Sequence, residues 1–323
     1  MAIIYYIRYM ENNEIQMGAK TTGAMVGGEA KHPFLRLHIG VLLAGATSLF
    51  GRWISISELP LVWWRVVLSA IILTLVLGAS HKLHRIPLRH LLMIGGCGLL
   101  LAVHWVFFYG SIKAANVSIG AICVSLYGFF TALVEPIINR HRASVRELCL
   151  GVLSVLGIVL IFGFDDRYRL GIALGGVAAL MYALFAVSNK RVEASTGYDS
   201  STMLLYELVC GGIALSIVTP LYGLVQPDVQ IIPSENDIAL LVVFAAVFTI
   251  IPFLLQLQAL RSISAFTVNL SNNLEPVYSI ILAMLIFGET SELNGAFYAG
   301  VAIIVLSVVL QTILTKRKKT VGQ

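Results

Sequence analysis

The sequence predicts an all-α integral membrane protein with ten transmembrane helices in two inverted five-helix repeats. Of its 323 residues, 58% are hydrophobic and only 12% are charged, whereas ordinary soluble domains carry about 25% charged residues. The apolar residues form long runs, which are typical of membrane spans. The basic residues lie in short loops between the runs, so a positive-inside bias explains the net charge of +5. We therefore expect a lipid bilayer, and no nucleic acid, as a partner.

Ten apolar segments follow residues 1–36, which we expect to form a poorly ordered cytoplasmic tail. Most are close to the roughly 20 residues that a helix needs to cross a bilayer core. Helices are expected because a barrel would show alternating strands of about ten residues, and the sequence shows no such pattern. The expected spans are 37–54, 59–79, 91–112, 117–139, 148–164, 170–189, 201–225, 238–260, 262–287 and 293–314, followed by a basic cytoplasmic tail over 315–323.

The distribution of lysine and arginine predicts the orientation. If the amino terminus is inside, the inner loops and tails hold seventeen basic residues and the outer loops hold four. Both termini are therefore predicted to be cytoplasmic, which an even number of spans allows.

The loop 162–171 divides the chain into two candidate halves, residues 37–164 and 170–314, with five spans each. An odd number of spans per half forces the halves into opposite orientations. Many transporters are built in this way, with a binding site near the bilayer midplane between the halves.

Glu275 is the strongest candidate for a functional residue, because it lies near the middle of span 262–287. A charge at the bilayer centre costs roughly 2.5–3.5 kcal/mol on insertion scales. Pro276 is expected to kink the helix beside it. We expect this polar helix face to line a cavity, and the alternative is a buried network that ties helices together. The further candidates on this helix are Asn269, Asn272 and Asn273.

Other ionisable or helix-breaking residues lie inside predicted spans. Arg65 either snorkels to the outer headgroups or faces the cavity, where it could bind a carboxylate or pair with Glu275. His104 could carry a proton or bind a solute, although a lone histidine on an apolar helix is more often a packing residue. Pro252 is expected to break the eighth helix, with Gln256 one turn later.

Several ionisable residues have simpler explanations. Glu135 and Glu207 lie near the inner ends of their spans, where we expect them to snorkel or to pair with basic loop residues. His81, His84 and His90 belong to a basic inner loop rather than to a metal site. We therefore expect no metal and no cofactor.

Two stretches resemble the EamA-type branch of the drug/metabolite transporter superfamily, and the likeness covers about residues 37–314. The more specific one is "NLSNNLEPVYSIILAMLIFGE" (269–289) in the ninth span. The other is "VWWRVVLSAIIL" (62–73), where Pro60 and Arg65 fit the pattern of the second span. In the fourth span Tyr127 and Gly128 stand where many members carry a proline, and Tyr127 could fill or gate the cavity.

This resemblance implies two EamA-like five-helix repeats that form a carrier in the plasma membrane, here a bacterial inner membrane. Many bacterial members export amino acids or related metabolites, so we expect a secondary transporter of small polar metabolites that works by alternating access. Tyr182 joins the residues above as a cavity candidate. A proton and a second copy of the chain are further candidate partners.

The alternatives are a non-transporting scaffold or receptor and an intramembrane enzyme. A scaffold would need a large soluble domain or tail. An enzyme would need a nucleophile–base pair or a metal cluster at one depth. The predicted spans contain neither, so we expect no enzymatic activity.

Overall fold

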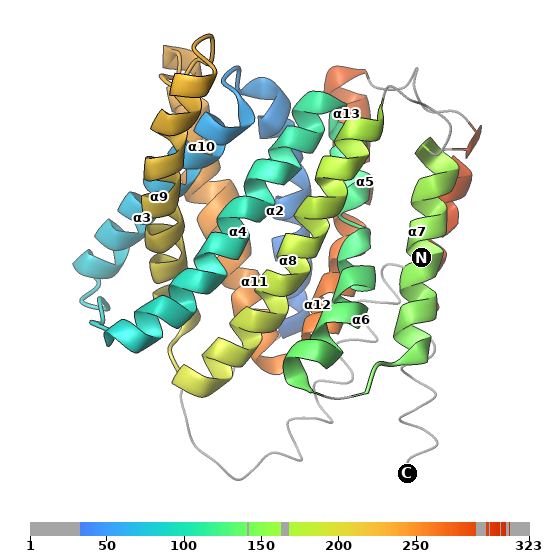
Figure 1. The fold of residues 1–323 in the computed structure, drawn as a ribbon, viewed down its shortest axis with the longest axis horizontal. Coiled ribbons are helices and arrows are strands. Elements are labelled where there is room, and N and C mark those ends of the chain that lie inside the picture. The colour runs from blue at the N-terminus through green and yellow to red at the C-terminus, as the bar shows by residue number, and fades with distance from the viewer. Residues whose placement is uncertain are drawn as a thin grey trace.

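The computed structural model describes residues 33–140, 142–162, 168–288, 295–296, 298–303, 305–307 and 310. The first nine predicted spans coincide with helices (Figure 1). Most of the tenth span and the basic tail lie outside the described residues, as do residues 1–32. The elements are α2 (Pro33–Trp53), α3 (Glu58–Ala79), α4 (Leu88–Ala114), α5 (Val117–Cys123), α6 (Leu126–Asn139), α7 (Val145–Phe162), α8 (Arg169–Thr196), α9 (Ser200–Val225), α10 (Glu235–Ala245), the π-helix η2 (Ala246–Ile250), α11 (Ile251–Ser262), α12 (Ala265–Ser271), the 3-10 helix η3 (Asn272–Leu274) and α13 (Glu275–Phe287).

The helices form a bundle with apolar side chains on its outside. Among the described residues, seven spans are long and apolar enough to cross a membrane, with α5–α6 and α10–α11 each counted as one. Large outward-facing side chains such as Ile71, Leu75, Ile217 and Leu224 are more than half exposed. Such a surface suits lipid and not water. The chain is therefore a multi-pass membrane protein.

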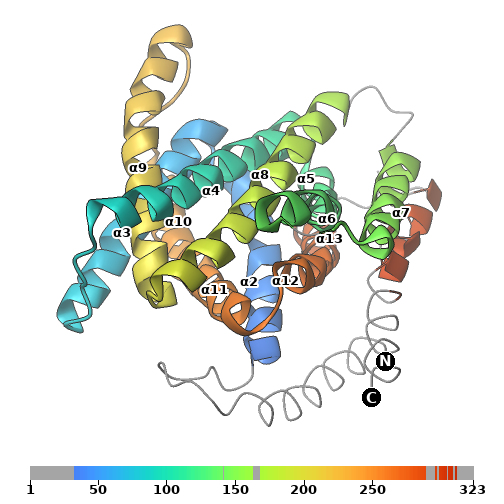
Figure 2. The same cartoon turned by 60° about the horizontal axis from the view of Figure 1, so that its bottom comes forward.

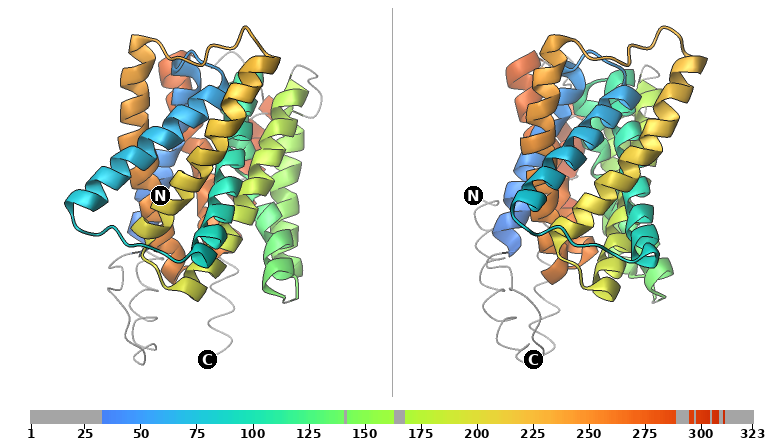
Figure 3. Two further views of the ribbon diagram at one scale, coloured as in Figure 1. Left: turned by 60° about the vertical axis from the view of Figure 1, so that its left-hand side comes forward. Right: turned by 90° about the vertical axis from the view of Figure 1, so that its left-hand side faces the viewer.

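The two ends of the bundle can be told apart by the loops (Figure 3). The loop from α3 to α4 lies at one end, and the loop from α9 to α10 lies at the opposite end. The helices therefore pass up and down through the bundle, as the predicted spans require.

Three of the spans in the described part of the chain are interrupted inside the bundle. The eighth contains the π-helix η2 and continues with Pro252 in the first turn of α11. The ninth changes from α12 to η3 at Asn272 and restarts at Glu275, with Pro276 in the first turn of α13. A proline is tolerated there because the first turn of a helix leaves its N–H groups unpaired. The ninth helix thus changes its hydrogen bonding at Asn272, the residue whose carbonyl Pro276 cannot bond, so the irregularity lies where Pro276 predicts it.

The interruption of the fourth span was not predicted. Its two parts, α5 and α6, meet at Val124 and Ser125, which are neither proline nor glycine. Local sequence therefore carries no strong signal for this break.

Glycines allow helices to touch in the core. A Cβ atom on Gly45 of α2 would lie 2.8 Å from the Tyr278 Cβ of α13, and the Ser279 hydroxyl donates to the Gly45 carbonyl at 2.7 Å. On α4, a Cβ on Gly98 would lie 2.2 Å from the Glu207 carbonyl oxygen of α9. Figure 2 shows α2 among the surrounding helices, with α11 on one side of it and α12 and α13 on the other.

Candidate functional site

A small cavity in the bundle brings together six of the nine predicted cavity side chains. These are Arg65, His104, Tyr127, Tyr182, Gln256 and Glu275, and the remaining lining residues are Ala44, Thr47, Trp105, Phe108, Tyr109, Pro252 and Phe253. The cavity volume is about 30 Å³, which is room for about two water molecules. An organic solute would need the surrounding helices to move apart.

Arg65 lies inside the bundle, and its side chain is only 1% exposed. The carbon at the centre of its guanidinium lies 4.1 Å from the ring centre of Trp105 and 4.4 Å from that of Phe244. Such cation–π contacts stabilise a desolvated cation. Of the two alternatives for Arg65, snorkelling is therefore excluded and a place in the cavity wall is observed.

Two hydrogen bonds orient the guanidinium of Arg65. Nε donates to Thr249 Oγ1 at 2.7 Å, and Nη1 donates to the Tyr109 hydroxyl at 3.0 Å. Nη2 has no hydrogen-bond partner within the described part of the chain. Since Arg65 lines the cavity, these remaining N–H groups are available to a ligand there.

The π-helix η2 supplies one of these partners. The Thr249 hydroxyl donates to the Phe244 carbonyl at 2.9 Å, five residues earlier in the chain, so its oxygen can accept from Arg65. Pro252 is the second residue of α11, which follows η2, and it cannot donate a hydrogen bond to the Phe248 carbonyl. Short π-helices are often found at functional sites. The predicted break at Pro252 is the one sequence signal that could have pointed to Thr249.

Glu275 faces the same cavity from the first position of α13 and is 7% exposed. Among the described residues its carboxyl group has neither a hydrogen bond nor an ion pair within 4.0 Å, although the charge of Arg65 acts on it. The cavity thus carries one cation and one carboxyl group that are not bound to each other.

His104 both packs and lines the cavity, so the two explanations given for it are compatible. Its Nδ1 lies 2.9 Å from the Ala178 carbonyl oxygen. A carbonyl can only accept, so Nδ1 carries a proton. Nε2 lies 3.4 Å from the Tyr127 hydroxyl and can accept from it, which describes a neutral imidazole with a defined tautomer.

Two stacked tyrosines connect the halves of the bundle. The rings of Tyr127 and Tyr182 have centroids 4.3 Å apart. The Tyr182 hydroxyl donates to Gln256 Oε1 at 2.6 Å and accepts from Asn272 Nδ2 at 3.3 Å. Asn272 thus supports the cavity wall without lining it.

The residues of the predicted polar face of the ninth span do not all lie at the cavity. Asn269 donates from Nδ2 to Thr131 Oγ1 at 2.7 Å, which ties α12 to α6. Asn269 and Asn272 are fully buried outside the cavity lining, in the helix-tying role given above as the alternative. The side chain of Asn273 lies outside what the structure describes. Within this face, Glu275 lines the cavity.

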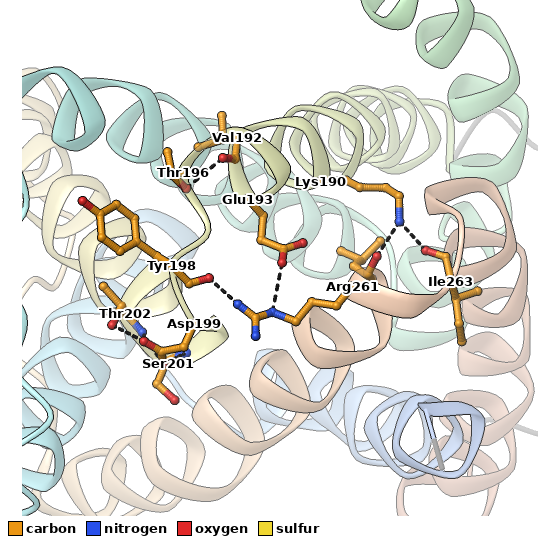
Figure 4. Close-up of polar contacts among 11 residues, drawn as sticks. Lys190, Val192, Glu193, Thr196, Tyr198, Asp199, Ser201, Thr202, Arg261 and Ile263 are labelled. Carbon is orange, nitrogen blue, oxygen red and sulfur yellow. Dashed lines mark hydrogen bonds and ion pairs between the residues drawn. The ribbon is translucent and has the colours of Figure 1, made fainter. Parts of the chain in front are cut away.

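Polar contacts close the bundle where α8 ends and α9 begins (Figure 4). We call this the basic end, after Lys190 and Arg261. Lys190 Nζ donates to the carbonyl oxygens of Leu260 and, at 2.6 Å, Ile263. Arg261 pairs with Glu193 at 3.0 Å and also donates to the Tyr198 carbonyl. These contacts hold α8 and the following turn against the end of α11.

The histidines of the basic loop do not gather around a metal position. His90 Nδ1 instead contacts the Tyr198 hydroxyl at 2.9 Å. Among the described residues, no three His, Cys, Asp or Glu side chains are placed to hold a metal ion together.

The chain is similar to known proteins in sequence and in fold. The model of the EamA-like transporter family matches it twice, over residues 35–163 and 169–313. An "uncharacterized transporter YxxF" of Bacillus subtilis is 22% identical over 284 residues, 83% of this chain and 88% of that protein. An "uncharacterized transporter" of Clostridium kluyveri is 23% identical over 226 residues, 66% of this chain and 70% of that protein. A crystal structure matches in fold with a TM-score of 0.65 at 16% identity, covering 87% of this chain and 98% of that one.

Proposed function

Because the chain belongs to the EamA-like transporter family and is a membrane transporter, we propose that it exports amino acids or related zwitterionic metabolites by alternating access. The observation that carries this proposal is the pairing of charges in the cavity. Arg65 keeps free N–H groups there, and Glu275 presents a carboxyl group to the same space.

A carboxylate of the solute would bind at Arg65. A guanidinium offers a planar fork that matches a carboxylate, and the contacts to Trp105, Phe244 and Thr249 hold that fork in one orientation. A solute ammonium group would bind at Glu275. The aromatic rings of Phe108 and Tyr182 offer apolar surface for the rest of the molecule.

Glu275 also gives a route to proton coupling. A carboxylate at the bilayer centre is costly without a positive partner. When a solute ammonium group leaves, a proton can take its place on Glu275. Solute and proton then compete for one group, which is what an exchanger requires.

The small size of the cavity supports alternating access. Its small volume and the contacts at the basic end indicate that α8 and α11 must separate before a solute can pass. We place the protein in the bacterial plasma membrane with both termini in the cytoplasm, so the basic end faces the cytoplasm. A second copy of the chain stays a candidate partner.

The test is a panel of metabolites in proteoliposomes that contain wild-type protein, Glu275→Gln or Arg65→Lys. Glu275→Gln should abolish flux driven by a pH gradient and still allow solute exchange, at a higher solute concentration because the charged partner of the ammonium group is lost. Arg65→Lys keeps the charge and loses the fork, so affinity for solutes with a carboxylate should fall about tenfold, the equivalent of about 1.4 kcal/mol.

Equal loss of exchange and of pH-driven flux in Glu275→Gln would reject proton coupling and leave a binding role. Absence of flux for every solute with the wild type would favour the non-transporting scaffold. Unchanged affinity in Arg65→Lys would show that the carboxylate does not bind at Arg65.

A further inference from the structure

A second buried carboxyl group lies outside the cavity. Glu207 is the eighth residue of α9 and is 1% exposed. Its Oε1 accepts a hydrogen bond from Asn189 Nδ2 of α8. Its Oε2 is buried and has no partner among the described residues. The place of Glu207 in the sequence predicts that it snorkels or pairs with a basic loop residue. The structure contradicts this prediction, because the carboxyl group is buried and is bound by Asn189.

The neighbouring elements offer Glu207 no described cation. From α4 the nearby titratable side chain is Cys97, and from α8 the polar neighbour is Asn189. Cys210 follows on α9 itself. Burial and the bond from Asn189 are the influences that act on the carboxyl group, and α3 and α11 add no charge to them among the described residues.

A carboxylate in such a place would be very costly. It would have lost its water and would keep one hydrogen bond, with no cation in compensation. The neutral acid avoids this cost. In the described conformation Glu207 therefore carries a proton.

Glu207 and Arg65 occupy equivalent positions in the two halves. Arg65 is the eighth residue of α3, as Glu207 is of α9. At 1.5 Å per residue, each lies about 10 Å from the start of its helix. The two helices start at opposite ends of the bundle (Figure 3). Glu207 is therefore the member of the pair that lies toward the basic end.

The contacts of Lys190 at the basic end lie next along the chain to the hydrogen-bond partner of this acid. Lys190 directly follows Asn189 in α8, and it holds the end of α11 through the Leu260 and Ile263 carbonyls. If α8 and α11 separate there, water reaches the pair of Asn189 and Glu207. The O–H bond of Glu207 can then break, the proton passes to water, and the carboxylate keeps its hydrogen bond from Asn189.

We propose that Glu207, with Asn189, is a second proton-binding site, which opens to the basic end and is closed in this conformation by the contacts of Lys190 and Arg261. This inference rests on the assignment as a transporter, but it needs neither the proposed solute nor a role for Glu275. Two carboxyl groups at different depths would then exchange protons in different conformations.

The test is infrared spectroscopy of the full-length protein in liposomes without any solute. At neutral pH, Glu207→Gln should remove the carbonyl-stretch signal of one protonated carboxyl group, and Glu275→Gln should keep that signal. Asn189→Ala leaves the acid in place and should shift the frequency of the same signal. A shift in Asn189→Ala therefore assigns the signal to Glu207 even if the Glu207→Gln variant does not fold.

Transfer to heavy water then tests the route of the proton. Lys190→Ala should speed deuterium exchange of the Glu207 signal about tenfold, because an opening easier by about 1.4 kcal/mol is ten times more frequent. Lys113→Ala is the matched control, because Lys113 Nζ also donates to a backbone carbonyl, that of Ile54 at 3.1 Å. Lys113 lies at a loop that is predicted to face the other side of the membrane.

A signal that survives in Glu207→Gln, with no shift in Asn189→Ala, would show that Glu207 is ionised and would overturn the proposal. Equal exchange rates in Lys190→Ala and Lys113→Ala would overturn the route through the basic end. Since no solute is present, neither result bears on the proposed substrate.

Discussion

The guanidinium of Arg65 shows how single residues can prepare a site. Its faces are covered by two rings, and Nε and Nη1 are bound. The ability of Thr249 to accept from Arg65 depends on the π-helix. The Thr249 hydroxyl donates its proton to the Phe244 carbonyl, which leaves its oxygen free to accept. We infer that Thr249 is a positioning residue, which acts on a solute through Arg65.

Thr249→Val and Thr249→Ser separate this role from packing. Valine keeps the shape and removes the hydroxyl, which leaves Arg65 Nε buried without a partner at a cost of about 1–3 kcal/mol. The solute concentration for half-maximal exchange should rise about tenfold in Thr249→Val and should return to near the wild-type value in Thr249→Ser. If both variants are impaired alike, Thr249 matters through its shape and does not orient Arg65.

At the scale of elements, interrupted helices bring polar groups to the cavity. Close contacts between helices hold those helices at a defined position along the bundle. Glu275 is the first residue of α13 after the break at η3, and Tyr127 is the second residue of α6 after the break at Val124 and Ser125. Between α4 and α9 the contact is made by the backbone itself, at Gly98. This contact holds the part of α9 that carries Glu207.

Gly98→Ala and Gly96→Ala test that contact within one helix. A methyl group at Gly98 would overlap the Glu207 carbonyl, and overpacking of this kind costs about 1–3 kcal/mol. A Cβ atom at Gly96 would meet nothing within 4 Å, and alanine is the better helix former by about 1 kcal/mol. The midpoint of thermal unfolding in detergent should fall for Gly98→Ala and rise slightly for Gly96→Ala. Equal changes in the two midpoints would contradict the close contact.

For the whole molecule, the two halves share a local plan that supports the predicted inverted repeat. The fourth and ninth spans each begin with a seven-residue helix, α5 and α12. The eleventh residue from each start is a cavity residue, Tyr127 in the first half and Glu275 in the second. The family model also matches each half separately.

The orientation of the molecule can be tested with single cysteines in a variant that lacks the four native ones. Lys82 is exposed in the loop from α3 to α4, and Asp228 is exposed in the loop from α9 to α10. These loops lie at opposite ends (Figure 3). In intact cells a membrane-impermeant maleimide should label Asp228→Cys, whereas Lys82→Cys should react only after permeabilisation. The reverse pattern would place both termini outside.

Helix positions and several of the buried ionisable residues could be predicted from the sequence because lipid imposes strict rules. Backbone groups must pair within each span, and about 20 apolar residues cover the bilayer core. Nine predicted spans therefore coincide with helices, and Arg65, His104 and Glu275 could be singled out. The neighbours of each polar group could not be predicted, because these helices are apolar all around and their pattern does not show which face meets which partner. Tyr182 and Gln256 line the cavity as predicted, but packing of distant segments placed Asn269 outside it, Thr249 against Arg65, and Glu207 beside Asn189.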